Sequence, residues 1–336
     1  MTTTLLIFSA ALALAIGGTP LARRLAWRVG VTDAPSDRKV HQQPMPLLGG
    51  LAIYAAVMVA IVAFGERQEV AQLAGILIGA TLVSFLGLWD DRRPLPPSLR
   101  LLAQVGAAAV AVASGVQVLL FGVPIVDAAI SVLWIVTITN AINFMDNMDG
   151  LAGGVSAVAA GYFLLLAVAN DQQLVAPLAA AVLGACLGFL YYNFNPASIF
   201  MGDGGALFLG YVLACIGIKL RFPGQSYYVT WLVPVLVLAV PLFDLGLVLI
   251  SRGRRRVNPF TTAGTDHLSH RLTRLGLSQR EAALVIYLVC CAAGGVAIFV
   301  SMADLVEAAA VFAAAAVFGA WSLWRLEFAG PRVARA

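Results

Sequence analysis

Residues 124–169 read PIVDAAISVLWIVTITNAINFMDNMDGLAGGVSAVAAGYFLLLAVA and hold two apolar runs, 124–143 and 151–169, joined by a short polar segment. Each run has roughly the 20 residues that an α-helix needs to cross a hydrocarbon core about 30 Å thick. Lipid offers the backbone no hydrogen bonds, so a run of this kind must satisfy its own amides and carbonyls as a helix. The stretch therefore predicts two membrane helices. Because the polar Asn140 interrupts the first apolar run, a broken first helix is an alternative.

The rest of the chain repeats this pattern. Nine further apolar runs lie at 3–20, 47–64, 71–88, 100–120, 174–192, 206–220, 229–250, 282–301 and 305–324. Hydrophobic residues make up 61% of the 336 residues and charged residues only 11%, whereas a soluble domain carries about 25% charged residues. We therefore expect a single integral-membrane domain, residues 1–336, that folds as an all-α polytopic transmembrane bundle of about 11 helices.

The basic residues are distributed unevenly between the two sides of the predicted bundle. If the N-terminus lies outside, 18 of the 21 Lys and Arg residues fall on the cytoplasmic side. The positive-inside rule then predicts an outside N-terminus, a cytoplasmic C-terminus and a multi-pass protein of the plasma (inner) membrane. The net charge of +4 reflects this orientation, and because the sequence has no base-reading motif we expect no nucleic-acid partner.

Carboxylates gather where predicted helices meet the cytoplasmic side. Asp90 and Asp91 end one predicted helix, and such a pair suits a divalent metal or proton transfer, although a solvated helix end is the simpler alternative. Asn143, Asp146 and Asp149 are spaced by three, so they share one face if the segment is helical. Two acids and an amide at the end of an apolar helix are hard to explain by packing, which favours a functional site.

Asp203 lies between two glycines directly before a predicted helix. Mg²⁺ usually takes one or two protein carboxylates together with substrate phosphates, so this position suits a metal that bridges a diphosphate. The backbone amides of a glycine-rich turn and a helix N-terminus add affinity for anions. The alternative is a turn in which Asp203 only caps the helix.

Two basic loops complete the polar segments. The segment 33–41 contains Lys39 and suits an anionic ligand or, alternatively, a plain juxtamembrane positive cluster. The loop 252–280 contains His267, His270 and Arg271, which suit contacts with a pyrophosphate, although an exposed amphipathic helix is an alternative. Carboxylates, histidines and arginines at one membrane boundary fit phosphoryl transfer, because its catalysis is mostly positioning and neutralisation of charge.

The motifs occur in a recognisable order: Asp-Asp at 90–91, Asn-x-x-Asp-x-x-Asp-Gly at 143–150, Phe-Met-Gly-Asp-x-Gly at 200–205 and Asp-His-Leu-Ser-His-Arg at 266–271. Over roughly residues 30–285 the chain resembles the polyprenyl-phosphate N-acetylhexosamine-1-phosphate transferases, whose superfamily includes phospho-N-acetylmuramoyl-pentapeptide transferase. The last motif resembles the histidine loop of the GlcNAc-1-phosphate branch.

The resemblance implies an activity. The expected enzyme is a phosphoglycosyl transferase that uses Mg²⁺ or Mn²⁺ at the cytoplasmic face. It would move N-acetylhexosamine-1-phosphate, most simply GlcNAc-1-phosphate, from a UDP-sugar to undecaprenyl phosphate and release UMP. Such a step starts a cell-envelope glycan, for example lipopolysaccharide or teichoic acid in cell wall biogenesis. The implied partners are UDP-N-acetylhexosamine, undecaprenyl phosphate and membrane lipids, and a homodimer stays open.

The resemblance also implies roles for the matching positions. Asp203 resembles the metal-binding aspartate. The implied catalytic residues are Asp90, Asp91, Asp146, Asp149, His267 and His270. The implied substrate-binding residues are Asn143, Asn193 and Phe200, and the two basic loops add Lys39 and Arg271 as candidates for binding the substrate.

Three positions depart from the family pattern and leave alternatives open. Ser269 stands where the GlcNAc-type motif has a histidine, Asn147 where the third motif usually has a glycine, and Ser98 where related enzymes have a lysine. Another UDP-amino sugar or UDP-MurNAc-pentapeptide is therefore an alternative donor. A secondary transporter is a rival of another class, but its acids would lie near the midplane and its chain would usually show repeats. An inactive scaffold would not need every carboxylate motif.

Overall fold

The computed structural model describes residues 1–33, 44–65, 69–258 and 264–329, and within them the chain is almost wholly helical. The helices are α1 (Thr2–Val29), α2 (Gly49–Phe64), α3 (Val70–Arg92), α4 (Pro97–Ala113), α5 (Pro124–Met145), α6 (Leu151–Ala169), α7 (Val175–Asn193), α8 (Asp203–Lys219), α9 (Tyr227–Val237), α10 (Ala239–Arg254), α11 (Leu268–Arg274), α12 (Gln279–Met302) and α13 (Leu305–Trp324). A π-helical turn, η1 (Arg325–Ala329), comes after α13, and β1 (Thr32–Asp33) pairs antiparallel with β2 (Met45–Pro46). The all-α prediction is confirmed.

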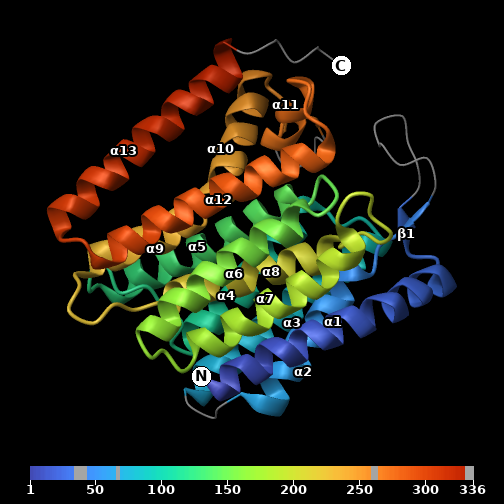
Figure 1. The fold of residues 1–336 in the computed structure, drawn as a ribbon, viewed down its shortest axis with the longest axis horizontal. Helices are drawn as coiled ribbons and strands as arrows, with labels where there is room; N and C mark the ends of the chain where they lie inside the picture. The colour runs from blue at the N-terminus through green and yellow to red at the C-terminus, as the bar shows by residue number, and fades with distance from the viewer. Residues whose placement is uncertain (34–43, 66–68, 259–263, 330–336) are drawn as a thin grey trace.

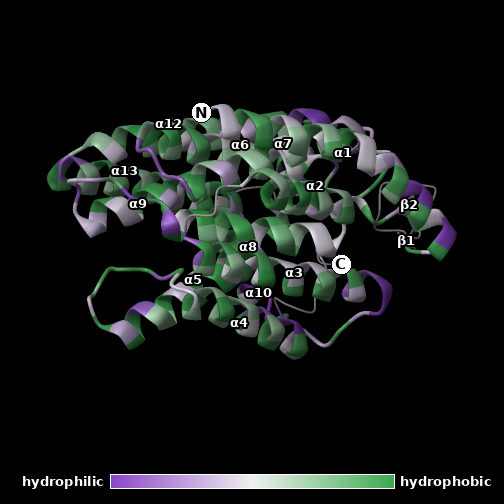
Figure 2. Cartoon of the chain, turned by 90° about the horizontal axis from the view of Figure 1, so that it is seen from below, coloured by the Kyte–Doolittle hydropathy of each residue, from purple (hydrophilic) through white to green (hydrophobic). Residues whose placement is uncertain are grey.

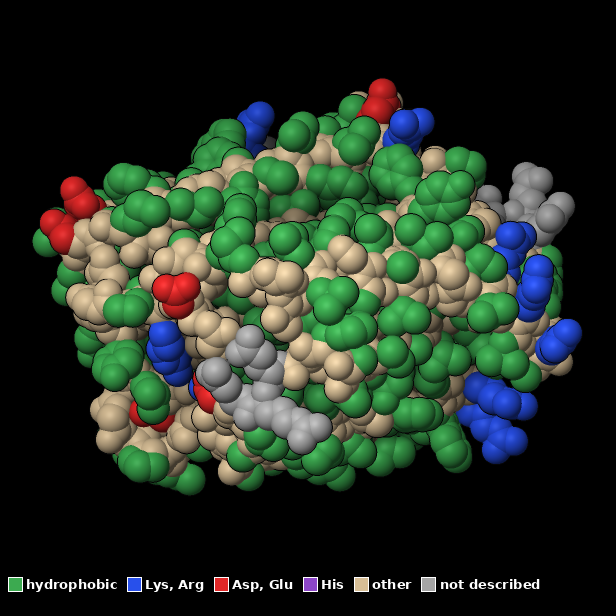
Figure 3. Space-filling view, turned by 60° about the horizontal axis from the view of Figure 1, so that its bottom comes forward, with side chains coloured by type: hydrophobic (Ala, Val, Ile, Leu, Met, Phe, Trp, Pro, Cys, Tyr) green, Lys and Arg blue, Asp and Glu red, His purple; other side chains and the backbone are tan. Residues whose placement is uncertain are grey.

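The protein is a multi-pass membrane protein. Seven of its described helices are long and apolar enough to span a bilayer, and the bent pair α9 and α10 is an eighth candidate. The shorter apolar helices α2 and α4 fill two further predicted runs. Hydrophobic side chains cover most of the face seen in Figure 3, and most of the Lys and Arg in view lie toward one edge of it. In Figure 2 the strongest hydrophilic colour lies at helix ends and in connecting segments, as expected for a bundle in lipid.

Two predicted helices differ from expectation. Asn140 does not break α5, because its side-chain amide donates to the carbonyl of Val136 one turn earlier and to Gln104 of α4. The run 229–250 does break, and α9 and α10 meet at an angle of 71°. Pro241 in the first turn of α10 has no amide to donate to the carbonyl of Val237, and its ring clashes with a carbonyl in that position, so α9 ends at Val237.

Helix α8 forms the centre of the bundle and places the site. Its residues from Gly204 to Ile218 are all buried, and it packs chiefly against α3 and α5. On one side α7 lies between α1 and α6 (Figure 1). At the start of α8, Gly87 of α3 packs directly on the backbone of Asp203, where a Cβ would lie 2.5 Å from the Asp203 carbonyl carbon. Glycine at 87 therefore allows the polar ends of α3 and α8 to meet.

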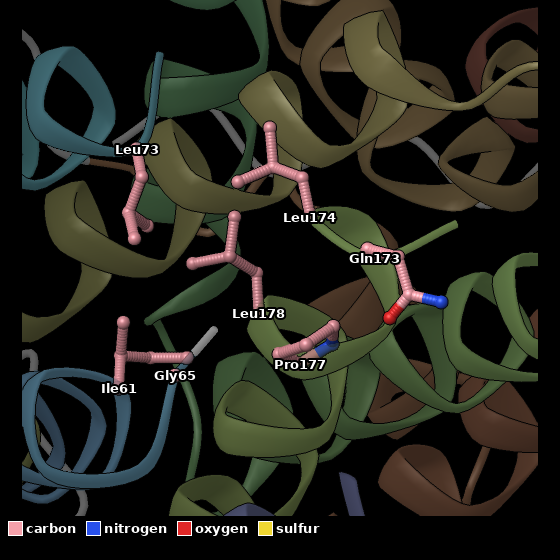
Figure 4. Close-up of a pocket in the computed structure, with 7 residues that line it drawn as sticks. All are labelled: Ile61, Gly65, Leu73, Gln173, Leu174, Pro177 and Leu178. Atoms are coloured by element: carbon pink, nitrogen blue, oxygen red, sulfur yellow. The ribbon is translucent and has the colours of Figure 1, made fainter. Parts of the chain in front are cut away.

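A small pocket lies at the opposite end of α3, where α2 ends and α7 begins. It is lined by Ile61, Gly65, Leu73, Gln173, Leu174, Pro177 and Leu178 (Figure 4). Leu73 is near the start of α3 and Asp91 is at its end, which puts them about 27 Å apart at 1.5 Å per residue. With a mainly apolar lining and no carboxylate in it, this pocket has no part in the carboxylate site described below.

Candidate active site

The predicted carboxylates meet where α3 ends and α8 begins. Asp91, in the last turn of α3, accepts a hydrogen bond from the backbone amide of Asp203 at 2.9 Å and one from Gly204 at 3.3 Å. These are amides of the first turn of α8, which have no partner within the helix and favour negative charge. Gly202 supports this arrangement with a φ of 74°, a left-handed backbone conformation that glycine adopts at little cost. Asp91 thus caps α8 from another helix and fixes the position of Asp203.

Arg100, near the start of α4, joins three of the polar groups. Its guanidinium lies 2.7 Å from a carboxylate oxygen of Asp90 and 3.4 Å from one of Asp203. It also donates to the side-chain oxygen of Asn143 at 3.2 Å, and the Asn143 amide donates to Asp203 at 2.7 Å. Asp90 further accepts from the backbone amide of Leu95 at 2.6 Å. Arg100 therefore supplies the positive charge that holds Asp90 and Asp203 on one side of the site.

Asp146 comes directly after α5 and lies beside this group. Burial, and after it the negative charge of Asp203, raises the pKa of Asp146 to about 7. A carboxyl group with a pKa near neutrality can hold or release a proton at physiological pH, which is what a general base or acid requires. Asn143 and Asp146 thus both lie beside Asp203, although α5 ends at Met145 and Asp146 itself is not helical.

Asp149 and Asn193 support the segment that precedes α8. Asp149 accepts hydrogen bonds from the Asn195 side chain and the Ala197 amide, both at 3.0 Å. Asn193 accepts from the Gly150 amide at 3.1 Å and donates to the Ile199 carbonyl at 2.9 Å. Both residues hold the chain 194–199 against the start of α6, so the structure gives them a positioning role. Their predicted contacts with reactants stay predictions.

Phe200 also has backbone contacts that define the site. Its amide donates to the carbonyl of Pro46 at 2.9 Å, and its carbonyl accepts from Gly49 at 3.0 Å. These bonds join the β2 segment and the start of α2 to the turn before Asp203. A role of Phe200 in nucleotide binding stays a prediction, and Lys39 lies outside the described residues.

The histidine loop packs against the same end of α5. His267 shares a hydrogen bond of 2.8 Å between its Nδ1 and Asp244 of α10, and Asp244 also accepts from the Leu268 amide at 2.6 Å. The His267 ring lies 5.9 Å from the Phe144 ring and 6.1 Å from that of His270, measured between centroids. Burial, and after it the charge of His267, lowers the pKa of His270. This shift favours the neutral imidazole of His270, which is suited to hydrogen bonding rather than to charge.

Ser269 links the histidine loop to the carboxylate segment. Its hydroxyl donates to the side-chain oxygen of Asn147 at 2.6 Å. These are two of the positions at which the sequence departs from the family pattern, and the structure joins them to each other. The loop's position relative to Asp146 thus depends on this contact.

Arg271 is buried and contacts the protein itself. Its guanidinium donates to the Asp266 carbonyl at 2.9 Å, to the Ser251 hydroxyl at 3.2 Å and to Glu327 at 2.6 Å. The predicted contact of Arg271 with a diphosphate stays a prediction, and the structure assigns it a place in the support of the loop.

Sequence reasoning missed Arg100, Asp244 and Glu327 as parts of the site. Asp244 carried one usable signal, because a carboxylate inside an apolar membrane run is costly unless it is paired. Arg100 carried another, because it lies two residues after Ser98, a position at which related enzymes have a lysine. Glu327 carried none, since acids at helix ends are common.

The donor set at the carboxylate site fits a hard divalent cation. Among the residues that the structure describes, no three His, Cys, Asp or Glu side chains form a preformed metal cage. Mg²⁺ does not need one, because it usually binds one or two carboxylates and takes its other ligands from water and substrate phosphates. Asp203 and Asp146 would supply oxygen ligands of this kind.

Comparisons with known proteins place the chain in a family. The profile of the family described as glycosyl transferase family 4 matches residues 73–221. A Bacillus subtilis protein named as a probable undecaprenyl-phosphate N-acetylglucosaminyl 1-phosphate transferase is 37% identical over 280 residues, which cover 81% of this chain and 77% of the relative. The decaprenyl-phosphate N-acetylglucosaminephosphotransferase of Mycobacterium tuberculosis is 32% identical over 79% of this chain and 74% of its own.

A third relative is more distant in sequence. The undecaprenyl-phosphate alpha-N-acetylglucosaminyl 1-phosphate transferase of Escherichia coli K12 is 25% identical over 80% of this chain and 76% of its own. The chain belongs to glycosyl transferase family 4. The family predicted from the motifs is therefore confirmed, and the protein is a transferase of the membrane.

Proposed function

We propose that the protein transfers GlcNAc-1-phosphate from UDP-GlcNAc to a polyprenyl phosphate, with undecaprenyl phosphate as the acceptor, and releases UMP. The observation that carries this proposal is the joining of Asp90, Asp91, Asn143 and Asp203 through Arg100 and the first turn of α8. Such a cluster at a shared end of membrane helices can meet a water-soluble diphosphate and a lipid phosphate at once. The names of the relatives support the same acceptor and sugar.

The reaction exchanges one phosphoanhydride bond for another. An oxygen of the lipid phosphate attacks the sugar-bearing phosphorus of the donor, and the bond between that phosphorus and the bridging oxygen of UMP breaks. The products are polyprenyl-diphospho-GlcNAc and UMP. Charge spreads over the phosphoryl oxygens in such a step, so catalysis rests on positioning and neutralisation.

The chain's own residues supply that positioning. Arg100 holds Asp90 and Asp203 in place, and Asp91 holds the first turn of α8, so the carboxylates are already positioned before a substrate binds. Asp146, whose carboxyl group has a pKa of about 7, would lose its proton before it takes part in binding a cation. The neutral His270 would donate or accept a hydrogen bond at the sugar diphosphate.

We further propose dependence on Mg²⁺ or Mn²⁺. A divalent cation bound there would neutralise the diphosphate and polarise its phosphoryl oxygens. Asp203 and Asp146 would hold it, and the fit of their oxygens to a hard cation supports this assignment.

The site would face the cytoplasm. Loops rich in Lys and Arg lie on the cytoplasmic side of a membrane protein. Arg92 and Arg93 come directly after Asp91, so this rule supports a cytoplasmic site. At the opposite end of α8, Lys219 is paired with Glu69 at 2.8 Å, so less free positive charge lies there.

The direct test is the mass of the lipid product. Purified protein in detergent would be given undecaprenyl phosphate and one UDP-sugar at a time: UDP-GlcNAc, UDP-GalNAc, UDP-glucose or UDP-MurNAc-pentapeptide. We expect a lipid heavier by one GlcNAc-phosphate with UDP-GlcNAc as the preferred donor. A lipid heavier by a different sugar phosphate would correct the donor, and unchanged lipid in every reaction would refute the transfer.

A further inference from the structure

The last membrane helix makes few contacts with the bundle along its length. Within α13, Ala308 is the buried residue, and in Figure 1 the helix stands apart from its neighbours before its C-terminal end reaches α10 and α11. The turn η1, directly after α13, is packed more closely. It contains Glu327, whose side chain is only 7% exposed.

Glu327 is held by two arginines from the histidine-loop region. One carboxylate oxygen lies 2.6 Å from Arg271, and that pair is buried, with both side chains 7% exposed. The other oxygen lies 2.7 Å from Arg254, whose side chain is 47% exposed and whose guanidinium also lies 4.1 Å from the centre of the Phe328 ring. The Leu326 carbonyl accepts a further hydrogen bond from Arg271 at 2.5 Å.

The contacts of Arg271 lead from this turn to His267. The Arg271 side chain donates to the carbonyl of Asp266, and its backbone amide donates to the carbonyl of His267 at 3.0 Å. The side-chain carboxylate of Asp266 is paired with Arg252 at 2.8 Å and with Arg255 at 2.6 Å. Arg271 therefore binds the backbone carbonyl of His267 and that of the residue before it. Glu327 neutralises the buried charge of Arg271.

We propose that Glu327 is a positioning residue for sugar-nucleotide binding, and that η1 is a latch that holds the histidine loop through Arg271. The latch joins the end of the chain to a much earlier loop, since Glu327 and Arg271 lie 56 positions apart in the sequence. The donor would be a nucleoside diphosphate sugar, so this proposal rests on the proposed function. Without Glu327 the guanidinium of Arg271 is a buried charge without its carboxylate, which costs far more than the loss of an exposed pair.

The loop's stability is measured first, because it needs no substrate. Hydrogen exchange of residues 264–275 would be followed in the full-length protein in detergent. We expect Glu327→Ala to raise exchange there about tenfold or more, the scale on which loss of one partner of a buried charge pair acts. Glu327→Asp, which keeps the charge, should restore most of the protection. Unchanged exchange in Glu327→Ala would overturn the latch.

Two further variants serve as controls. Arg254→Gln removes the half-exposed partner of Glu327 and should change exchange about threefold at most, because exposed pairs contribute little. Glu307→Gln lies on the same helix at its other end, where Glu307 is exposed and caps the first turn of α13. It should leave both exchange and turnover unchanged. An equal effect of Glu307→Gln would mean that α13 as a whole, rather than Glu327, sets the loop.

Turnover then separates positioning from general loss of fold. A reduced folded fraction lowers kcat and leaves both KM values unchanged, whereas a displaced loop weakens donor binding. For Glu327→Gln we expect the KM for UDP-GlcNAc to rise about tenfold while the KM for polyprenyl phosphate changes less than about twofold. Equal changes in both KM values, or a lower kcat alone, would refute the positioning role. If the unmutated protein turned over no UDP-sugar, the proposed function would fail, while the exchange experiment would still decide the latch.

Discussion

Asp91 accepts a hydrogen bond from the backbone amide of Asp203, although the two residues lie 112 positions apart in the sequence. The contact places a carboxylate at the N-terminus of α8, where the helix dipole favours negative charge. It also makes the position of the proposed metal-binding carboxylate depend on α3. Asp90, its neighbour, instead pairs with Arg100, so the adjacent acids have different partners.

This difference predicts different outcomes for the two aspartates. Asp91→Asn keeps an acceptor for one amide but loses the negative charge at the first turn of α8, whereas Asp90→Asn loses its pair with Arg100. We expect at least one variant to lower kcat on the order of a hundredfold, as loss of acid–base or metal assistance does. Steady-state kinetics with thermal unfolding as control would measure it. Near-normal kcat in both variants would make the pair purely structural.

Arg100 should not tolerate lysine. Its guanidinium contacts Asp90, Asp203 and the Asn143 side chain at once, and a lysine ammonium cannot reproduce that planar arrangement. We expect Arg100→Lys to lower kcat/KM roughly tenfold to a hundredfold, the effect of losing one hydrogen bond between charged groups. Arg93→Lys, on the exposed side of the same end, is the matched control and should retain activity. Equal activity of Arg100→Lys and the unmutated protein would exclude Arg100 from the site.

The raised pKa of Asp146 predicts a link between proton and cation binding. Below pH 7 this carboxyl group holds its proton, so a divalent cation must displace it. The Mn²⁺ concentration at half saturation should therefore fall as pH rises from 6 to 7, by up to about tenfold per pH unit for one displaced proton, and then level off. Electron paramagnetic resonance of Mn²⁺ with UDP-sugar present would follow binding without turnover. The same slope in Asp146→Asn would assign the proton to another group.

The contact between Ser269 and Asn147 predicts an effect on donor choice. Ser269→His removes the 2.6 Å hydrogen bond and adds a bulky ring next to the carboxylate segment. The ratio of kcat/KM between UDP-GlcNAc and UDP-GalNAc should shift, because specificity resides in differential contacts in the transition state. Ser269→Ala removes the bond without the ring and tests the contact alone. Unchanged ratios in both variants would place the sugar outside the reach of this loop.

The fold was largely predictable because lipid restricts the backbone. Every apolar run of the sequence is occupied by a helix or by the bent pair, since length and hydropathy determine which segments can span a membrane. The breaks were less predictable. The sequence left open whether α5 breaks at Asn140. The helix is continuous there, and Gln104 of α4 pairs with Asn140, a partner in space that a local sequence pattern does not reveal.

The carboxylates of the site could be predicted from the sequence, but the residues that hold them and the histidine loop in position could not. The spacing of Asn143 and Asp146 and the glycines around Asp203 indicated residues that do meet. Asp149 was predicted from the same spacing, yet the chain turns after α5 and directs it to Asn195. Glu327 could not be foreseen, because its partners are folded onto it from two other elements.

The central claim is tested most directly by UMP release from the purified protein. With UDP-GlcNAc, undecaprenyl phosphate and Mg²⁺ together, we predict UMP in a one-to-one ratio with lipid product, and none when either substrate is omitted. EDTA should abolish release, excess Mg²⁺ should restore it, and Asp203→Asn should lower it by at least about a hundredfold while its thermal unfolding stays near that of the unmutated protein. UMP formed without the lipid acceptor, or full release by Asp203→Asn in EDTA, would contradict the account.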